Sequence, residues 1–304
     1  MEPFRIHILG CGSALPTLRH NASSQVVEIR EKLFMIDCGE GTQMQLRRSR
    51  LRFTKINHIF ISHIHGDHCF GLIGLISTFG MLGRVAPLHV YATPEYRQML
   101  NAQMDMFCGG LEYEVVFHPI DTTRCEVIYE DRSLTVKTIP LCHRVPCCGF
   151  LFEEKPTLPH IRRDMVDFYK IPVSQINNIK LGYGWTTEDG EVIPHSRLTQ
   201  PAAPARSYAY CSDTRYMPEL HKLVKGVSTL YHEATYSSEN KERAKIYYHS
   251  TASEAARVAS DAGAGQLIIG HYSARYDTDR ILLDEAKKTF EKTFAAEEMA
   301  VFNV

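Results

Sequence analysis

The sequence concentrates metal-ligand side chains in one short run, Ser-His-Ile-His-Gly-Asp-His at residues 62–68. Imidazole nitrogens and carboxylate oxygens are preferred ligands of zinc. The run directly follows the strand-like stretch His-Ile-Phe-Ile-Ser, and Gly66 permits a sharp bend within it. A loop at a strand end can aim several side chains at one point, and four ligands exceed what one ion needs. The alternative is a surface loop that is only rich in histidine. The predicted ligands are His63, His65, Asp67 and His68.

Strand-like and helical patterns alternate along the chain, which predicts an α/β protein whose sheets are covered by helices. Thr93 before Pro94 predicts one helix start, and Thr251 with Glu254 has the spacing of a capping box for a helix that ends at Gly263. Apolar runs bounded by turn residues predict strands at 4–9, 25–29, 33–37, 58–62, 88–92, 134–139, 149–153, 207–211, 227–232, 266–270 and 299–304.

Residues 154–204 interrupt this rhythm, because they are rich in proline and charge and contain few strand-like runs. We expect a single domain over residues 1–304 with an inserted, flexible arm at 154–204, in which residues 160–171 form a short helix. An irregular insertion of this length inside a domain is uncommon and is often functional. A disordered insertion is the alternative.

Composition limits the class of protein and its location. The 304 residues are 44% hydrophobic and carry a net charge of -1, which argues against a surface coated in basic charge. The nine cysteines include no Cys-x-x-Cys pair, so we expect buried thiols in a reducing compartment and no cysteine zinc site. No signal segment and no apolar run of membrane-spanning length is visible, which predicts a cytoplasmic location.

The His-x-His-x-Asp-His pattern behind a strand resembles the metallo-β-lactamase superfamily. The resemblance implies an αββα sandwich, and it implies three later ligands, each behind a strand: His143, Asp213 and His271. It further implies two zinc ions per subunit, with manganese or another divalent ion as the alternative. By the same resemblance, His63, His65 and His143 hold one ion, Asp67, His68 and His271 hold the other, and Asp213 bridges the two.

Three further stretches, at residues 9–24, 37–46 and 232–259, resemble the short form of the ribonuclease Z family. The most specific are His-Glu-Ala-Thr at 232–235 and His-Ser-Thr at 249–251. The resemblance implies a zinc-dependent endoribonuclease that removes the 3′ trailer of precursor tRNA, and a homodimer. We expect His249 to act as general acid and Glu233 to orient it, while Asp67 handles the proton of the water. A structural His–Glu contact at the capped helix is the alternative.

RNA contacts are predicted from basic residues in three places. Arg52 and Lys55 precede the histidine run in a basic stretch, and Arg19 lies in the first loop. A charged face that only contacts solvent is the alternative explanation of such a stretch. In the family the arm grips the tRNA, although several acidic residues offset the charge of this arm. Its candidate phosphate ligands are Arg162, Arg163 and Lys180.

Two other functions stay open at this point. The same scaffold and metals also serve arylsulfatase-like enzymes and cyclic-nucleotide phosphodiesterases, because fold does not fix substrate. A non-catalytic RNA-binding homologue is the third possibility, and the complete set of seven metal-type ligands argues against it.

Overall fold

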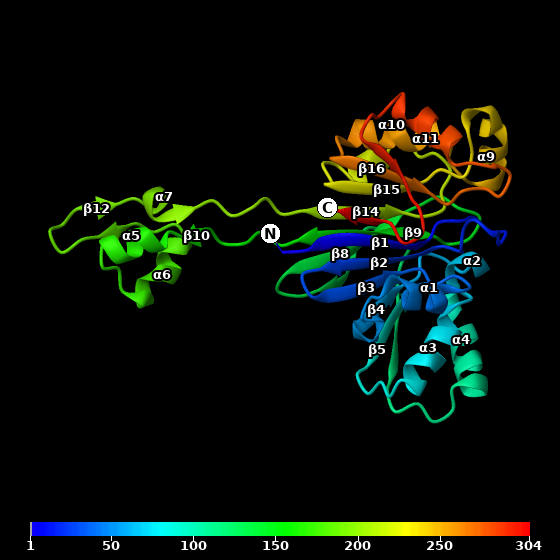
Figure 1. Ribbon diagram of the computed structural model, residues 1–304, viewed down its shortest axis with the longest axis horizontal. Coiled ribbons are helices and arrows are strands. Elements are labelled where there is room, and N and C mark those ends of the chain that lie inside the picture. Colours follow the sequence, from blue (N-terminus) through cyan, green and yellow to red (C-terminus); the bar gives the residue numbers. More distant parts are fainter. Residues whose placement is uncertain (1) are drawn as a thin grey trace. The chain divides into compact units, whose positions relative to one another are not determined.

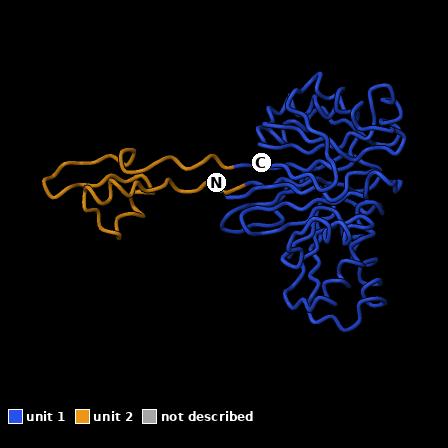
Figure 2. Tube along the Cα trace, in the orientation of Figure 1, with its two compact units in different colours: residues 1–153, 206–304 blue, residues 154–205 orange. Residues whose placement is uncertain are grey.

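The computed structural model describes residues 2–304, which form two separate units (Figures 1 and 2). The larger unit runs to Glu153 and resumes at Arg206, and the smaller unit spans Glu154–Ala205. The inserted segment that the sequence predicts at 154–204 therefore corresponds in its bounds to the smaller unit.

Two seven-stranded sheets make up the centre of the larger unit. In spatial order the first consists of β18 (Val301–Asn303), β1 (Phe4–Gly10), β2 (Ser24–Ile29), β3 (Lys32–Ile36), β4 (Ile56–Phe60), β5 (Leu88–Ala92) and β6 (Val115–Pro119). The second consists of β17 (Thr293–Ala295), β16 (Gln266–Gly270), β15 (Thr229–Glu233), β14 (Ser207–Cys211), β9 (Cys148–Glu154), β8 (Leu134–Pro140) and β7 (Val127–Glu130).

The sheets pack face to face through large apolar side chains. Phe60 on β4 lies 5.4 Å from Phe150 on β9, and Phe34 on β3 lies 5.8 Å from Phe152, measured between ring centroids. All four side chains are buried. Alternation along each strand turns one row of side chains toward the other sheet and the next row toward the covering helices.

Helices cover the outer face of each sheet (Figure 1). Those of the first sheet are α1 (Thr42–Ser49), α3 (Leu72–Met81) and α4 (Pro94–Phe107), with α2 (Gly66–Cys69) and η1 (Phe53–Lys55) between strands. Those of the second are α8 (Leu220–Leu223), α9 (Lys241–Tyr247), α10 (Ala252–Ala262) and α11 (Arg280–Lys287), with η2 (Ser238–Asn240) before α9. The αββα prediction is confirmed.

The start and stop signals that the sequence shows for helices coincide with helix ends in the structure. The capping box of α10 is formed by Thr251 and Glu254, and the helix stops at Gly263, whose φ of 64° is left-handed. The buried face of α10 is mostly alanine, which lets the helix lie close to the sheet. This capped helix fixes the segment before it, which carries His249.

The direction of the strands brings the candidate functional side chains to one edge of the two sheets. Strands β14, β15 and β16 are mutually parallel, as are β3, β4 and β5. The carboxyl ends of parallel strands meet at the same edge of a sheet, where loops of different strands can build one site. Asp213, Glu233 and His271 all lie at these ends, and so do Asp37 and the 62–68 run.

The smaller unit contains short elements around its own apolar cluster. Buried Ile171, Ile179, Ile193 and Leu198 form that cluster. The predicted helix at 160–171 is present but shorter. The elements are β10 (His160–Ile161), α5 (Arg163–Phe168), α6 (Val173–Lys180), β11 (Trp185–Thr186), β12 (Val192–Ile193), α7 (His195–Leu198) and β13 (Thr199–Gln200).

The cysteine thiols are mostly buried, as the composition predicts. All nine cysteines have free thiols, and all except Cys125 and Cys142 are buried. Between residues 2 and 304, no helix has the length and apolar character that crossing a bilayer requires.

Candidate metal centre

Seven imidazole and carboxylate side chains from four segments gather at the shared sheet edge. They are the residues that the sequence singles out as ligands: His63, His65, Asp67, His68, His143, Asp213 and His271. They fall into two groups that share Asp213.

The first group faces Asp213 Oδ2. His63 Nε2 lies 3.1 Å from His65 Nδ1, which lies 3.2 Å from His143 Nε2. Asp213 Oδ2 lies 3.7 Å from both His63 Nε2 and His143 Nε2. The imidazoles of His63 and His143 are fully buried.

The second group faces the other oxygen of the same carboxylate. Asp213 Oδ1 lies 3.1 Å from His271 Nε2 and 3.3 Å from His68 Nε2. Those two nitrogens are 3.3 Å apart, and Asp67 Oδ2 lies 3.5 Å from His68 Nε2 and 3.4 Å from His271 Nε2. Asp213 Oδ1 is buried, and no group in residues 2–304 donates a hydrogen bond of suitable geometry to it.

These spacings suit divalent cations. Four ligand atoms about 2.0–2.1 Å from a zinc ion at tetrahedral angles lie about 3.3 Å from one another. The distances given above span 3.1–3.5 Å in the second group and 3.1–3.7 Å in the first, whose four ligand atoms all lie within 4.8 Å of one another. The orphaned Asp213 Oδ1 would gain a partner from such an ion. The residues present therefore fit two cations bridged by one carboxylate.

The pKa shifts of the clustered side chains also indicate a site that stabilises cations. Burial and the neighbouring His68 lower the pKa of His63 well below its ordinary value, so its imidazole is neutral. Burial alone would raise the pKa of Asp213, but His271, His68 and His63 outweigh it and hold the carboxyl ionised. Around His68, burial is outweighed by three carboxylates, led by that of Asp213, which raise its pKa well above the ordinary value. The pocket thus stabilises positive charge.

Asp37, at the end of β3, orients two of these ligands. Its Oδ2 accepts hydrogen bonds from His68 Nδ1 at 2.8 Å and from the Tyr210 hydroxyl at 2.7 Å. Its Oδ1 accepts from the backbone N–H of Ser62 at 2.8 Å, and the Ser62 hydroxyl lies 3.0 Å from His63 Nδ1. Carboxylates in this position fix the tautomer and the direction of a ligating imidazole. Sequence reasoning assigned no role to Asp37, although it lies in the stretch 37–46 that resembles the family.

Backbone and hydroxyl groups orient the remaining histidines. His143 Nδ1 lies 3.0 Å from the carbonyl oxygen of Tyr248, and His271 Nδ1 lies 2.9 Å from the hydroxyl oxygen of Thr235. Each of these imidazoles therefore turns Nε2 toward the cluster. His271 and Asp37 both have a positive φ, at 62° and 55°. Such strain in residues other than glycine is concentrated at functional sites.

Glu233 and His249 lie beside the cluster as a buried pair. His249 Nδ1 donates to Glu233 Oε1 at 2.8 Å. The same carboxylate accepts from the Thr214 and Thr235 backbone N–H groups and from the Thr235 hydroxyl. Burial disfavours a charged His249, but Glu233 outweighs it and raises the pKa of His249 to about 9. Cations bound at the adjacent carboxylates would lower the pKa of His249 back toward its ordinary value.

Asp67 is also held from outside the cluster. Its Oδ2 accepts the backbone N–H of Ala14 at 2.7 Å, so the first loop lies directly beside it. Burial raises the pKa of Asp67, but His68 and His271 more than offset it, so the carboxyl is ionised.

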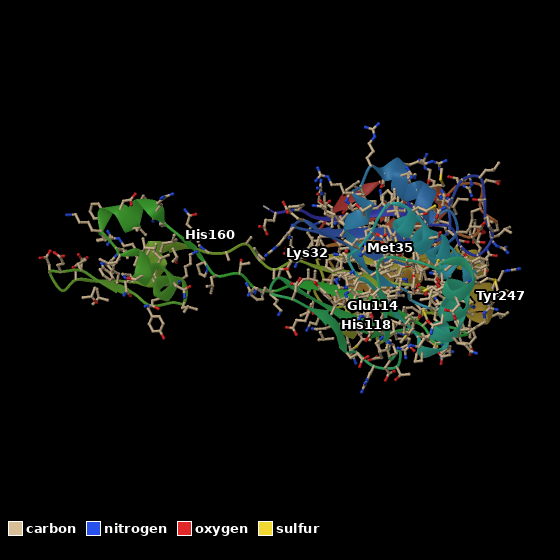
Figure 3. All side chains as sticks on the ribbon, turned by 90° about the horizontal axis from the view of Figure 1, so that it is seen from below. Lys32, Met35, Glu114, His118, His160 and Tyr247 are labelled. Carbon is tan, nitrogen blue, oxygen red and sulfur yellow. The ribbon has the colours of Figure 1, made fainter. Side chains whose placement is uncertain are left out.

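The predicted RNA contacts are not gathered at this centre. Lys55 and Arg52 are exposed before the start of β4, whereas His63 follows its end, so about 17 Å of strand separates them from the ligands. Lys32, which lines the same surface pocket as Lys55, lies on the opposite side of the larger unit from Tyr247 (Figure 3). Sequence neighbours at opposite ends of a strand are distant in space.

Other predicted contacts have local partners. The guanidinium of Arg19 donates to the carbonyl oxygens of Asp277 at 2.6 Å and of Tyr276, which ties the first loop to the segment after β16. In the smaller unit, Arg162 donates to Asp164 at 2.8 Å, Arg163 is exposed, and Lys180 ends α6 half-buried. The role of all six basic residues in RNA binding stays a prediction.

The sandwich with a histidine–aspartate cluster at its edge is that of metallo-β-lactamase-fold proteins. The structure is similar to the crystal structure of the short form of human tRNase Z, with a TM-score of 0.71 and 24% identity over 98% of each chain. It is also similar to the metallo-β-lactamase fold protein YhfI from Bacillus subtilis, with a TM-score of 0.70 and 17% identity over 100% of each chain. These likenesses establish the fold.

Comparison with related sequences identifies the family, which the structural likeness alone does not. The chain is 59% identical to a ribonuclease Z of Bacteroides fragilis and 50% identical to one of Porphyromonas gingivalis, in each case over 98% of both proteins. A family model described as Anti-Pycsar protein Apyc1 matches residues 4–158, about half of the chain, so this part also belongs to that sequence family. The chain belongs to the ribonuclease Z family. The predicted family, and the assignment as a nuclease of the hydrolase class that comes with it, are confirmed.

Proposed function

We propose that this ribonuclease removes the 3′ trailer of precursor tRNA by hydrolysis at the histidine–aspartate centre. The observation that carries the proposal is the pair of ligand groups with edges of 3.1–3.7 Å that share Asp213. The high identity to ribonuclease Z proteins along nearly the whole chain supports this substrate over a sulfate ester or a cyclic nucleotide.

Two zinc ions are the cofactors we propose, one in each ligand group, with manganese as an alternative that the same ligands accept. His63, His65 and His143 would hold one, and Asp67, His68 and His271 the other, with Asp213 shared. Such ions lower the pKa of a water molecule to about 7 and neutralise charge on a phosphodiester.

His249 supplies the proton for the leaving group. Hydrolysis that leaves a 3′-hydroxyl breaks the bond between phosphorus and the 3′-oxygen, and that oxygen departs as an alcohol only if it receives a proton. Glu233 occupies His249 Nδ1, which leaves Nε2–H as the proton donor. Glu233 is therefore a positioning residue whose hydrogen bond favours the charged imidazole.

Asp67 accepts or directs the proton of the attacking water. Its Oδ2 faces the ligand nitrogens of His68 and His271, and Ala14 holds it from the other side. These contacts fix the carboxylate in one orientation, which is what proton transfer from a positioned water requires.

Partners and location follow from the family resemblance. We propose that the enzyme works as a homodimer in the cytoplasm and that the smaller unit, residues 154–205, contacts the body of the tRNA. The apolar cluster of this unit supports the proposal, because an inserted segment that folds around its own core can present a defined surface.

The decisive experiment is a cleavage assay with precursor tRNA, with and without an encoded CCA end. We expect one discrete cut just after the discriminator nucleotide, and its loss when a chelator removes the metals. Hydrolysis of bis(p-nitrophenyl) phosphate without any discrete cut in the RNA, whichever divalent ion is added, would instead identify another hydrolase of this fold.

A further inference from the structure

A cavity opens beside His249. It has a volume of about 290 Å³. Its walls come from the segment after β14, from α9 and from the first turn of α10. The lining residues are Arg215, Tyr216, Lys241, Lys245, His249 and Glu254.

Positive charge dominates this cavity. Arg215, Lys241 and Lys245 all have exposed side chains there, and Glu254 is the carboxylate among the lining residues. Glu254 Oε2 accepts from the backbone N–H and the hydroxyl of Thr251, and its Oε1 lies 3.4 Å from Lys241 Nζ. Within residues 2–304, no carboxylate pairs with Arg215 or Lys245. Two cations therefore remain available to an anionic ligand.

The fold fixes Arg215 relative to the catalytic centre. It follows Asp213 by two residues, and its backbone N–H donates to the carbonyl oxygen of Cys142 at 2.9 Å. Its guanidinium lies 5.5 Å from the ring centroid of Tyr248, whose carbonyl oxygen accepts from His143 Nδ1. The cation is thus attached to the same segments that carry the ligands.

An aromatic and basic rim continues this surface. Tyr247, labelled in Figure 3, ends α9 two residues before His249. The guanidinium groups of Arg144 and Arg243 lie 5.8 Å and 5.3 Å from the centroid of its ring. Arginine and tyrosine in alternation suit the sugar–phosphate chain of a single strand better than a small neutral ligand.

We propose that this cavity, the His249-side pocket, binds the phosphate on the 5′ side of the nucleotide that the enzyme retains. The inference rests on the proposed function, because it places the retained nucleotide's 3′-oxygen at His249. The next phosphate on that side of the strand then belongs to the same nucleotide. Arg215 offers paired N–H donors to it, and Lys245 and Lys241 add point charges.

The test measures binding of the metal-loaded enzyme to an RNA that ends in the mature 3′-hydroxyl and so contains no trailer to be removed. In Arg215→Gln and Lys245→Gln we expect a dissociation constant about tenfold higher. The slope of log Kd against log salt concentration should fall by about 0.7 for each phosphate that the variant no longer binds. Lys245→Arg should restore most of the slope. Lys225→Gln, an exposed charge before the start of β15, is the matched control and should change neither quantity.

Neutral methylphosphonate linkages identify which phosphate is bound. One replaces the phosphate 5′ of the retained nucleotide in the mature-ended RNA, and another replaces the first phosphate inside the trailer of a precursor. The retained-side replacement should weaken binding by the wild-type enzyme about tenfold and binding by Lys245→Gln by less than about threefold, since both changes remove the same interaction.

If Lys245→Gln and the retained-side methylphosphonate weakened binding independently, so that their fold effects multiplied when combined, the assignment would be overturned. The assignment would also be wrong if Lys245→Gln and the methylphosphonate in the trailer were not independent in their effects on kcat/KM. A wild-type enzyme that binds the mature-ended RNA with this coupling but does not cut precursor tRNA would contradict the proposed function and leave the binding site standing.

Discussion

Glu233 and His249 form a buried pair joined by a 2.8 Å hydrogen bond, and the same carboxylate reaches His271, a candidate metal ligand, through the hydroxyl group of Thr235. The Thr235 hydroxyl has one proton, which it donates to Glu233 Oε2, so it accepts from His271 Nδ1. The orientation of the candidate acid is therefore coupled to that of a ligand.

Removal of the acid should affect RNA far more than an activated ester. We expect His249→Ala to lower kcat on precursor tRNA by about 10²–10⁴-fold. The loss on bis(p-nitrophenyl) phosphate should be much smaller, since p-nitrophenolate leaves without a proton. Single-turnover rates on both substrates decide the matter, with His221→Ala on α8 as control. Equal losses on the two substrates would argue for a structural role of His249.

Replacing the Glu233 carboxylate with an amide should lower stability and shift the pH dependence of catalysis. Its two oxygens accept four hydrogen bonds, and in Glu233→Gln the amide NH₂ must face donors on one side. We expect a loss of about 1–3 kcal/mol in the free energy of unfolding. The alkaline limb of the kcat profile, which His249 sets because the acid must be protonated, should also move to lower pH. Urea denaturation and a pH–rate profile measure the two effects, and an unshifted profile would exclude the positioning role.

Asp67 should be needed for metal retention as well as for turnover. In Asp67→Asn the second ligand group loses an anionic oxygen that lies 3.4–3.5 Å from two ligand nitrogens. We expect the metal content of purified protein to fall from about two ions per chain toward one. Elemental analysis provides the count, and Asp261→Asn, an exposed aspartate on α10, is the control. Two tightly held ions in Asp67→Asn would reject its assignment as a ligand.

Asp37 should contribute to both stability and metal affinity. Asp37→Ala leaves the buried donors of His68, Tyr210 and Ser62 without their acceptor. The expected cost is about 3–5 kcal/mol in unfolding free energy. Competition with a chelator should show metal affinity about 10–100-fold weaker. If a folded Asp37→Ala protein kept its affinity, Asp37 would have no orienting role.

His20 should make stability depend on pH. Hydrogen bonds to Asp279 first, and then to Glu298, raise the pKa of His20 to about 9, against the effect of burial. A raised pKa in the folded state means that the contribution is complete below pH 6.5 and disappears as pH rises through about 9. We expect about 1–2 kcal/mol, reduced by solvent screening. Urea denaturation at pH 6, 8 and 10 should show the difference between wild type and His20→Gln shrinking with rising pH, whereas a constant difference would refute it.

Long strands and capped helices were predictable because their signals are local. Alternation over 4–9 and 207–211, and the capping box at Thr251, involve only neighbours in sequence. The strands missed in the larger unit were β6, β7 and β17, which are sheet edges. Edge strands are short and partly solvated, so pairing with a neighbour decides their structure more than composition does.

The 62–68 run alone predicted four candidate ligands, because they crowd into one loop directly behind a strand-like stretch. The family resemblance implied the two-sheet fold and the other three ligands, His143, Asp213 and His271. The place of Asp37 behind His68 became visible only in three dimensions, since the two residues follow different strands. The tertiary structure also placed Lys55 away from the ligands and brought Arg215 and Lys245 together beside His249. The reason is physical: parallel strands collect their carboxyl ends at one edge, and which loops meet there depends on sheet order, which no local pattern records.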